Sequence, residues 1–119
     1  MSTTTPVMQL LQGYLKVTSE RQQLITANIA NVDTPGYHTR DINFQAAMQQ
    51  AMDEGNGNDV QMMQSSTEVE GLPERPDGNN VNMDRESLLM GETQLQYQMG
   101  VQLIKSEFHR LLTAIKGEN

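Results

Sequence analysis

The chain has 119 residues, and its composition limits both the size of its core and the partners it can bind. Only 36% of the residues are hydrophobic, 4% are aromatic and none is Trp, which is little material for a self-sufficient core. The formal net charge of −7 argues against nucleic acid or an anionic membrane as the main partner, because neither would meet a basic surface. The chain has no Cys, which excludes disulfides, thiolate metal sites and cysteine nucleophiles. We therefore expect one domain that becomes ordered mainly on assembly with partners.

The first segment, residues 1–33, is expected to hold a long helix that begins at about residue 6. Thr5 is a suitable cap and Pro6 suits the first helical position. The helix should stop near Asp33, because Pro35 lacks an amide hydrogen and disfavours helical geometry in the residue before it. Residues spaced three and four apart predict a coiled-coil seam, and additional leucines widen it enough to imply more than one neighbouring helix. The seam comprises Val7, Leu11, Tyr14, Thr18, Gln22, Ile25, Ile29 and Val32.

Residues 34–52 are expected to form a turn, an extended arm and a short helix. Pro35 presets φ at the second position of a type II turn, and Gly36 accepts the positive φ of the third. The chain must therefore change direction here. Apolar residues at helical spacing from Phe44 to Met52 then predict a short amphipathic helix.

Residues 53–81 are predicted to form a polar loop. Glycines, prolines and polar side chains dominate this segment, which cannot bury enough apolar area to offset its ordering entropy. A hairpin across residues 60–69 is the alternative. A calcium loop that starts at Glu54 fails, because Asp59 stands where glycine is needed and Ser65 where a bidentate glutamate is needed.

Residues 82–119 should form the second long helix, from about Asn82 to Lys116. Asp84 and Glu86 lie in a first turn where negative charge suits the helix dipole. About 35 residues at 1.5 Å each make a rod of about 50 Å. The fold class is therefore all-α, with two long terminal helices in a coiled-coil-like pair, joined by a turn, an extended arm and a polar, largely irregular loop. The seam of the second helix comprises Met90, Gln94, Tyr97, Val101, Ile104, Phe108, Leu111 and Ile115.

No set of residues predicts an enzyme. His38 and His109 are the only histidines and form no cluster with metal-ligand spacing. No serine lies in a nucleophile elbow or a Ser-x-x-Lys motif, and no glycine-rich loop could cradle a phosphate. We therefore expect no catalysis, no metal, no cofactor and no small-molecule substrate.

Three polar residues near the predicted turn allow two interpretations. Asn28 and Asn31 lie three apart on one helix face, where they could recognise a partner, but asparagine is also common near helix ends for local reasons. Tyr37 could likewise simply anchor the loop over the helix pair. The residues alone leave both interpretations open.

The same region carries a family resemblance. Ala27-Asn28-Ile29-Ala30-Asn31 followed by Thr34-Pro35-Gly36-Tyr37 resembles the N-terminal signature shared by axial proteins of the bacterial flagellum, which include rod, hook and hook-associated subunits. Two further stretches, Arg40–Phe44 and Asp77–Glu86, narrow the resemblance to the short proteins of the proximal rod. The likeness is dense over residues 20–44 and 77–116 and absent over residues 53–76.

This resemblance implies a structural subunit of the proximal rod, which packs by helical coiled-coil contacts into a tubular shaft that transmits torque. The implied partners are other copies of the chain, other rod subunits, the basal-body adaptor and the type III export apparatus. Residues 1–26 show no signal peptide, which by itself indicates a cytoplasmic protein. The resemblance instead implies export without a cleaved signal and a periplasmic place in the basal body. The competing interpretation is a soluble coiled-coil module, such as an export chaperone or regulator.

We expect the assembly and packing residues to lie around the turn and along the second seam. They are Ile25, Asn28, Ile29, Asn31, Val32, Thr34, Pro35, Gly36, Tyr37, Arg40, Asp41, Phe44, Tyr97, Val101, Ile104, Phe108, Leu111 and Ile115.

Overall fold

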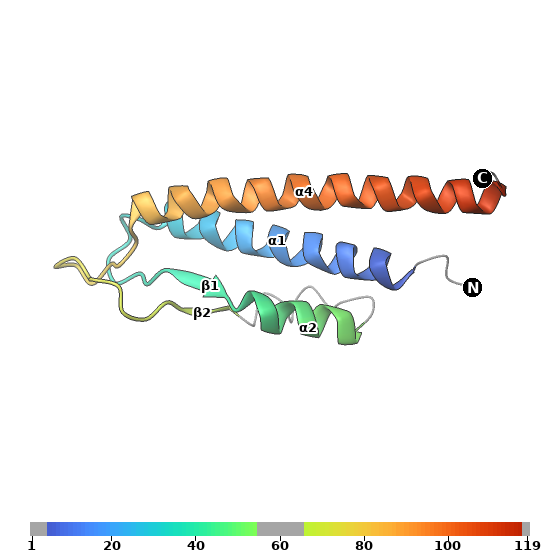
Figure 1. The fold of residues 1–119 in the computed structure, drawn as a ribbon. Coiled ribbons are helices and arrows are strands. Elements are labelled where there is room, and N and C mark those ends of the chain that lie inside the picture. Colours follow the sequence, from blue (N-terminus) through green and yellow to red (C-terminus); the bar gives the residue numbers. More distant parts are fainter. Residues whose placement is uncertain (1–4, 55–65, 118–119) are drawn as a thin grey trace.

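The computed structural model describes residues 5–54 and 66–117, and it is an elongated molecule of 65 × 25 × 19 Å. Helix α1 lies in the middle, with α4 antiparallel along one side and α2 and a small sheet along the other (Figure 1). The expected all-α architecture of two long terminal helices and an irregular central region is confirmed. The elements are α1 (Pro6–Ala30), β1 (Arg40–Ile42), α2 (Phe44–Glu54), β2 (Ser66–Glu68) and α4 (Met83–Lys116).

Helix α1 begins as its sequence predicts but ends earlier. The hydroxyl of Thr5 accepts a hydrogen bond from the amide of Met8 at 3.0 Å, and Pro6 is the first helical residue. The helix ends at Ala30 rather than near Asp33. Asn31 caps the helix: its backbone amide and its side-chain amide both donate to the Ala27 carbonyl, at 3.1 and 2.8 Å, and the next amide, of Val32, donates to Ile29 in a tighter turn.

The apolar core lies on the side of α1 that faces α2. Helix α2 lies against α1 at Gly13, where a Cβ would be in ordinary van der Waals contact with the Cβ of Ala51, at 3.6 Å. The Tyr14 and Phe44 rings meet edge to face with centroids 5.6 Å apart. The buried residues of this core are Val17, Leu24, Ile42, Ala47 and Ala51, with Phe44 and Met48 packed against them.

In the contact between α1 and α4, the residues of α4 that are most deeply buried are small or polar. Gly100 is buried, and a Cβ there would lie only 2.7 Å from Leu15 Cδ2. Thr93 and Glu86 are the other buried residues of α4. The residues of the predicted seam therefore fall into two groups that differ in solvent exposure. Val101, Ile104 and Leu111 are half-buried, whereas Gln94, Tyr97, Phe108 and Ile115 are exposed.

The arm after the turn pairs with part of the predicted loop. Strand β1 runs antiparallel to β2, with Arg40 opposite Glu68 and Ile42 opposite Ser66. The prediction of an extended arm and a short helix from Phe44 is confirmed. The expectation of a loop throughout residues 53–81 missed β2. Most of the rejected calcium loop and part of the alternative hairpin fall in residues 55–65, outside the described residues.

Candidate functional site: the turn network and the outer face of α4

Two loops that are far apart in sequence meet backbone to backbone at one end of the helix pair, which we call the turn end. Gly36 has the predicted positive φ, at 75°, and its amide donates to the Asp77 carbonyl at 2.9 Å. Gly78 has a φ of 84°, and a Cβ there would lie 3.4 Å from Gly36 Cα. The sequence stretches that carry the resemblance, around Pro35 and after Asp77, therefore form one structural unit.

Asn79 ties the second loop to the end of α1. Its side-chain amide donates to the carbonyls of Asn31 at 2.9 Å and Thr34 at 2.8 Å, and its side-chain oxygen accepts from the Val81 amide at 2.8 Å. Asn79 is fully buried. Its hydrogen bonds, rather than apolar area, order this part of the segment that was expected to be a solvated loop.

Asn28 is the centre of the turn end. Its amide group donates to the Arg40 carbonyl at 2.9 Å and to Glu86 Oε1 at 2.8 Å. Its oxygen accepts from the Tyr37 hydroxyl at 2.9 Å and from the Arg40 amide at 3.1 Å. All four hydrogen-bonding positions of this 1% exposed side chain are thus used within the chain, as suits a packing residue.

The buried charge of Glu86 is balanced by several donors. Beside Asn28, its carboxylate accepts from Arg85 Nη1 at 2.9 Å and from the Thr39 hydroxyl at 3.3 Å. The Thr39 amide in turn donates to Asn80 Oδ1 at 2.7 Å. A buried carboxylate is costly without such partners, so these contacts fix how α1, the arm and the start of α4 meet.

Tyr37 and Asn31 also make their side-chain contacts inside the protomer. The Tyr37 hydroxyl anchors the loop on Asn28, and burial raises the pKa of this phenol. Asn31 donates to Ala27 and accepts from the Thr34 hydroxyl at 3.0 Å. The geometry corresponds to the loop-anchor and helix-end interpretations of these residues.

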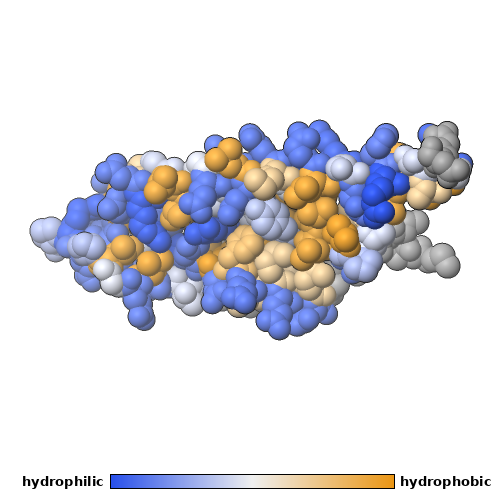
Figure 2. All heavy atoms as spheres, viewed as in Figure 1, coloured by the Kyte–Doolittle hydropathy of each residue, from blue (hydrophilic) through white to orange (hydrophobic). Residues whose placement is uncertain are grey.

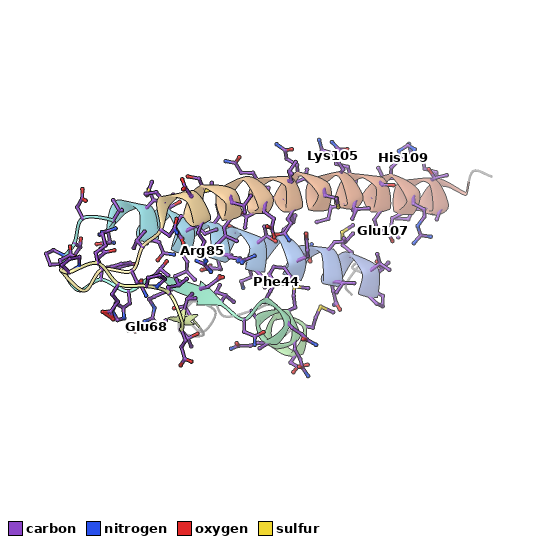
Figure 3. All side chains as sticks on the ribbon, turned by 60° about the vertical axis from the view of Figure 1, so that its left-hand side comes forward. Phe44, Glu68, Arg85, Lys105, Glu107 and His109 are labelled. Carbon is purple, nitrogen blue, oxygen red and sulfur yellow. The ribbon has the colours of Figure 1, made fainter. Side chains whose placement is uncertain are left out.

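Charged side chains hold β1 in place on both sides. Arg21 binds Asp41 through two hydrogen bonds of 2.9 and 3.0 Å, and this pairing raises the pKa of the guanidinium. Arg40 reaches across to Ser66, donating to its carbonyl at 2.6 Å and its hydroxyl at 3.2 Å. Arg40 and Asp41 therefore link the arm to β2 and to α1, while Phe44 lies between α1 and α2 (Figure 3).

His38 links two acidic residues, Glu68 and Glu74, at the outer edge of the turn end. Its Nδ1 lies 3.0 Å from Glu68 Oε1 and its Nε2 lies 3.4 Å from Glu74 Oε1. The hydrogen bond to Glu68 raises the pKa of the imidazole above its usual 6.5. A protonated ring can donate to both carboxylates, so His38 joins β2 to the loop that follows it.

The surface is apolar and open along the middle of the molecule and toward its other end, which we call the tail end. Leu10, Leu11, Tyr14, Met48, Met99 and Leu103 line a groove of about 310 Å³ between α1, α2 and α4. Figure 2 shows apolar side chains gathered over this part of the surface. The large apolar residues exposed on α4 are Met83, Leu88, Leu95, Tyr97, Met99, Leu103, Phe108, Leu112 and Ile115.

The part of the chain that the structure describes offers no set of three His, Asp or Glu side chains arranged to hold a metal ion. Among the described helices, none has the length and apolar character that crossing a membrane requires. The exposed apolar surface of α4 is therefore the most prominent candidate for function.

Comparison with known proteins identifies the family. Residues 8–38, which span α1 and the turn, match the family described as flagella basal body rod protein. The flagellar basal body rod protein FlgB of Salmonella typhimurium is 32% identical, with 94% of each chain covered. FlgB of Escherichia coli is 30% identical over 94% of each chain, and that of Aeromonas hydrophila 34% identical over 90%.

The chain belongs to the FlgB family of flagellar basal body rod proteins. It is a structural subunit of the flagellar basal body rod, and the expectation of a structural rather than enzymatic protein is confirmed. The resemblance drawn from the residues around Pro35 and after Asp77 is likewise confirmed. Family membership decides against a soluble export chaperone or regulator.

Several residues of the turn end were missed from sequence. Asn79, Asn80, Thr39 and Glu86 are all buried, yet each is a polar residue that composition assigns to a surface. The Asp77-Gly78 pair before two asparagines was a usable turn signal, because these residues favour tight turns with local side-chain bonds. Nothing local indicated that Glu86 would meet Asn28, 58 residues away.

Proposed function

We propose that this rod subunit assembles in the proximal rod through the apolar surface of α4, and that the resulting tube transmits torque. The observation that carries this proposal is the exposure of large apolar residues along α4. Ile115 is 74% exposed, Leu88 70% and Leu95 67%. Exposed side chains of this size are unusual in such number on one helix and suit an interaction surface.

Burial of this surface would contribute free energy of the same order as the cost of association. Full burial of one Leu or Phe side chain contributes about 1.5–3 kcal/mol. Burial of four such residues would therefore provide roughly 6–12 kcal/mol before the costs of association. The polar side chains of the turn end already have hydrogen-bond partners within the chain. The surface that remains available for binding a partner is therefore the apolar surface of α4.

The shape of the subunit suits a mechanical role. The helices run along the long axis of the molecule, and α4 is 34 residues long (Figure 1). Helices buried side by side between neighbouring subunits resist bending and twisting along that axis. The buried hydrogen bond between Asn28 and Glu86 opposes sliding of α1 against α4, so torque applied to one helix passes to the other.

The proposed partners are other copies of this chain, other rod subunits, the basal-body adaptor and the type III export apparatus. The proposed location is the periplasmic part of the basal body, reached by export without a cleaved signal peptide. Membership in a basal body rod family supports an assembly with other basal-body proteins. A small core suits export in an unfolded form, since little free energy opposes unfolding.

The test compares two aspartate substitutions on α4 in cells that express the chain as their rod subunit. Phe108→Asp places a charge on the exposed apolar surface, where burial of an unpaired charge costs several kcal/mol. Gln102→Asp changes an exposed polar residue and should be nearly silent. We expect basal bodies purified from the first strain to lack the subunit and those from the second to contain it. Equal incorporation of the two variants would overturn the proposal.

A further inference from the structure

The end of α1 has no positive charge of its own. No basic residue lies in the last turn of α1, and the first charged residue after the helix is Asp33. The carbonyl end of a helix carries a partial negative charge, which a nearby cation stabilises. Arg75, in the loop before α4, supplies this cation. Its Nη2 donates to the carbonyl of Val32, which stands two residues past the end of α1.

The same guanidinium also binds the backbone just before α4. Its Nη1 donates to the carbonyl of Val81 at 3.2 Å, and Val81 is buried and stands two residues before the start of α4. The chain that leaves α1 and the chain that enters α4 lie side by side at the turn end (Figure 1). Arginine holds its donors in a rigid planar fork, so two carbonyls bound by one guanidinium are fixed relative to each other.

The backbone of Arg75 is itself held in a tight turn. The Arg75 amide donates to the Asn79 carbonyl and the Gly78 amide donates to the Arg75 carbonyl, both at 2.8 Å. The carboxylate of Asp77, in the same turn, lies 4.0 Å from Arg75 Nε. The buried side chain of Asn79 binds the backbone that follows α1, so this turn cannot shift without breaking those hydrogen bonds. The guanidinium therefore extends from a fixed base.

We propose that Arg75 is a positioning residue that joins the end of α1 to the start of α4 and fixes the angle between the two helices. The hydrogen bond between Asn28 and Glu86 joins the helices at one point and opposes sliding. Arg75 adds a second, separate point of attachment, and two points restrain rotation where one does not. This inference rests on the proposed function, because the angle between the helices decides how the apolar surface of α4 is presented to a partner.

Pulsed electron paramagnetic resonance of the purified chain tests the inference. The chain has no Cys, so Gln9→Cys and Gln102→Cys place two spin labels at exposed positions far from the turn end. The 25 residues of α1 span about 37 Å, so a rotation of about 10° at the turn end moves the far end of α1 by about 6 Å. We expect Arg75→Gln to shift or broaden the distance between the labels by several Å in chains that circular dichroism shows to be folded.

Two further variants separate positioning from charge. Arg110→Gln is the matched control, because Arg110 is bonded within its own helix, to Glu107, and its loss should leave the label distance unchanged. Arg75→Lys keeps a charge beside the end of α1 but lacks the fork that binds two carbonyls. We expect Arg75→Lys to resist urea better than Arg75→Gln and yet to show the altered distance. If Arg75→Gln does not fold, Arg75→Lys decides the test.

An unchanged label distance in Arg75→Gln or Arg75→Lys would overturn the inference, and so would an equal change in Arg110→Gln. In cells, basal bodies should contain less of the Arg75→Gln subunit than of the Arg110→Gln subunit. Equal incorporation of these two variants would also overturn the inference, because the helix angle would then not matter for assembly. The proposed function is tested separately by Phe108→Asp, which leaves Arg75 intact.

Discussion

The two ends of the helix pair are held by different physical means. At the turn end, Asn28, Asn79 and Glu86 are buried and bonded to partners from four segments of the chain. At the tail end, Phe108 and Ile115 are more than half exposed, and grooves lie open between the helices. Hydrogen bonds need defined geometry, whereas apolar contact accepts any surface of suitable shape. The buried network of the turn end therefore specifies the shape of the subunit, and the exposed apolar residues along α4 are left for association.

The largest expected loss of stability comes from a substitution that removes hydrogen bonds of the turn end by replacing a single amide group. In Asn28→Asp, an oxygen replaces the amide group that donates to Glu86 and to the Arg40 carbonyl. Two buried carboxylates would then face each other without a proton donor between them. We expect the free energy of unfolding, measured by urea titration of the purified chain, to fall by about 3–5 kcal/mol.

Asn43→Asp is the matched control. The Asn43 side chain caps α2 by accepting from the Ala46 amide at 3.1 Å, and aspartate performs the same role. The control should change the free energy of unfolding by less than about 0.5 kcal/mol. If Asn28→Asp were no more destabilising than this control, Asn28 would not organise the turn end.

The structure also shows which parts of the fold were accessible from sequence. Signals that depend on neighbours in the chain gave correct predictions, such as the Thr5 cap, the positive φ of Gly36 and the start of α2 near Phe44. The burial of Asn28 and Glu86 could not be predicted from neighbours in the chain, because these two residues are hydrogen-bonded to each other across 58 residues of sequence. A polar residue carries no sign of where its hydrogen-bond partner lies.

The spacing of apolar residues identified only part of the face of α4 that meets α1, for a related reason. Large apolar residues occur on more than one side of α4, so their spacing alone does not identify the face that contacts α1. The side of α4 that is buried carries the small residues Thr93 and Gly100. Close packing of the α1 and α4 backbones favours small residues at their contact. The large apolar residues of α4 therefore lie mainly on its other sides, where they can contact partners.

The second prediction concerns this close contact. Gly100→Val would place atoms within 3 Å of Leu15, and overpacking of this kind costs about 1–3 kcal/mol. Gly91 lies on the same helix, and a Cβ there would meet no neighbouring described group within 4 Å. Gly91→Ala should therefore raise stability by about 1 kcal/mol through helix propensity. Thermal melts of both variants measure the contrast. Similar shifts in the same direction would mean that α1 and α4 do not pack closely at Gly100.

A third prediction tests the turn itself. The space around Gly36 is open, so a substitution there is penalised only by its φ of 75°. Gly36→Val should lower the free energy of unfolding by about 1–2 kcal/mol, because a β-branched residue strongly disfavours left-handed geometry. Gly36→Asn should cost clearly less, since asparagine tolerates this conformation. Equal urea midpoints for the two variants would show that the turn relaxes to another geometry.

The smallest expected effect is a pH dependence at the outer edge of the turn end. The hydrogen bond to Glu68 raises the pKa of His38, and the carboxylate of Glu74 faces the other ring nitrogen. A group whose pKa is higher in the folded chain stabilises the fold while it is protonated. This contribution is therefore complete below the unfolded pKa of about 6.5 and is lost as the pH rises through the higher folded value.

An NMR titration of the His38 ring measures this shift directly. Glu68→Gln removes the charge that accepts from His38, so the pKa of the ring should fall toward its ordinary value. Glu70→Gln removes the same charge from an exposed position two residues away and serves as the control. A His38 pKa that responds equally to both substitutions would indicate a diffuse effect of acidic surface charge. A response confined to Glu68→Gln would show that the edge of the turn end is held by the same directed bonds as its centre.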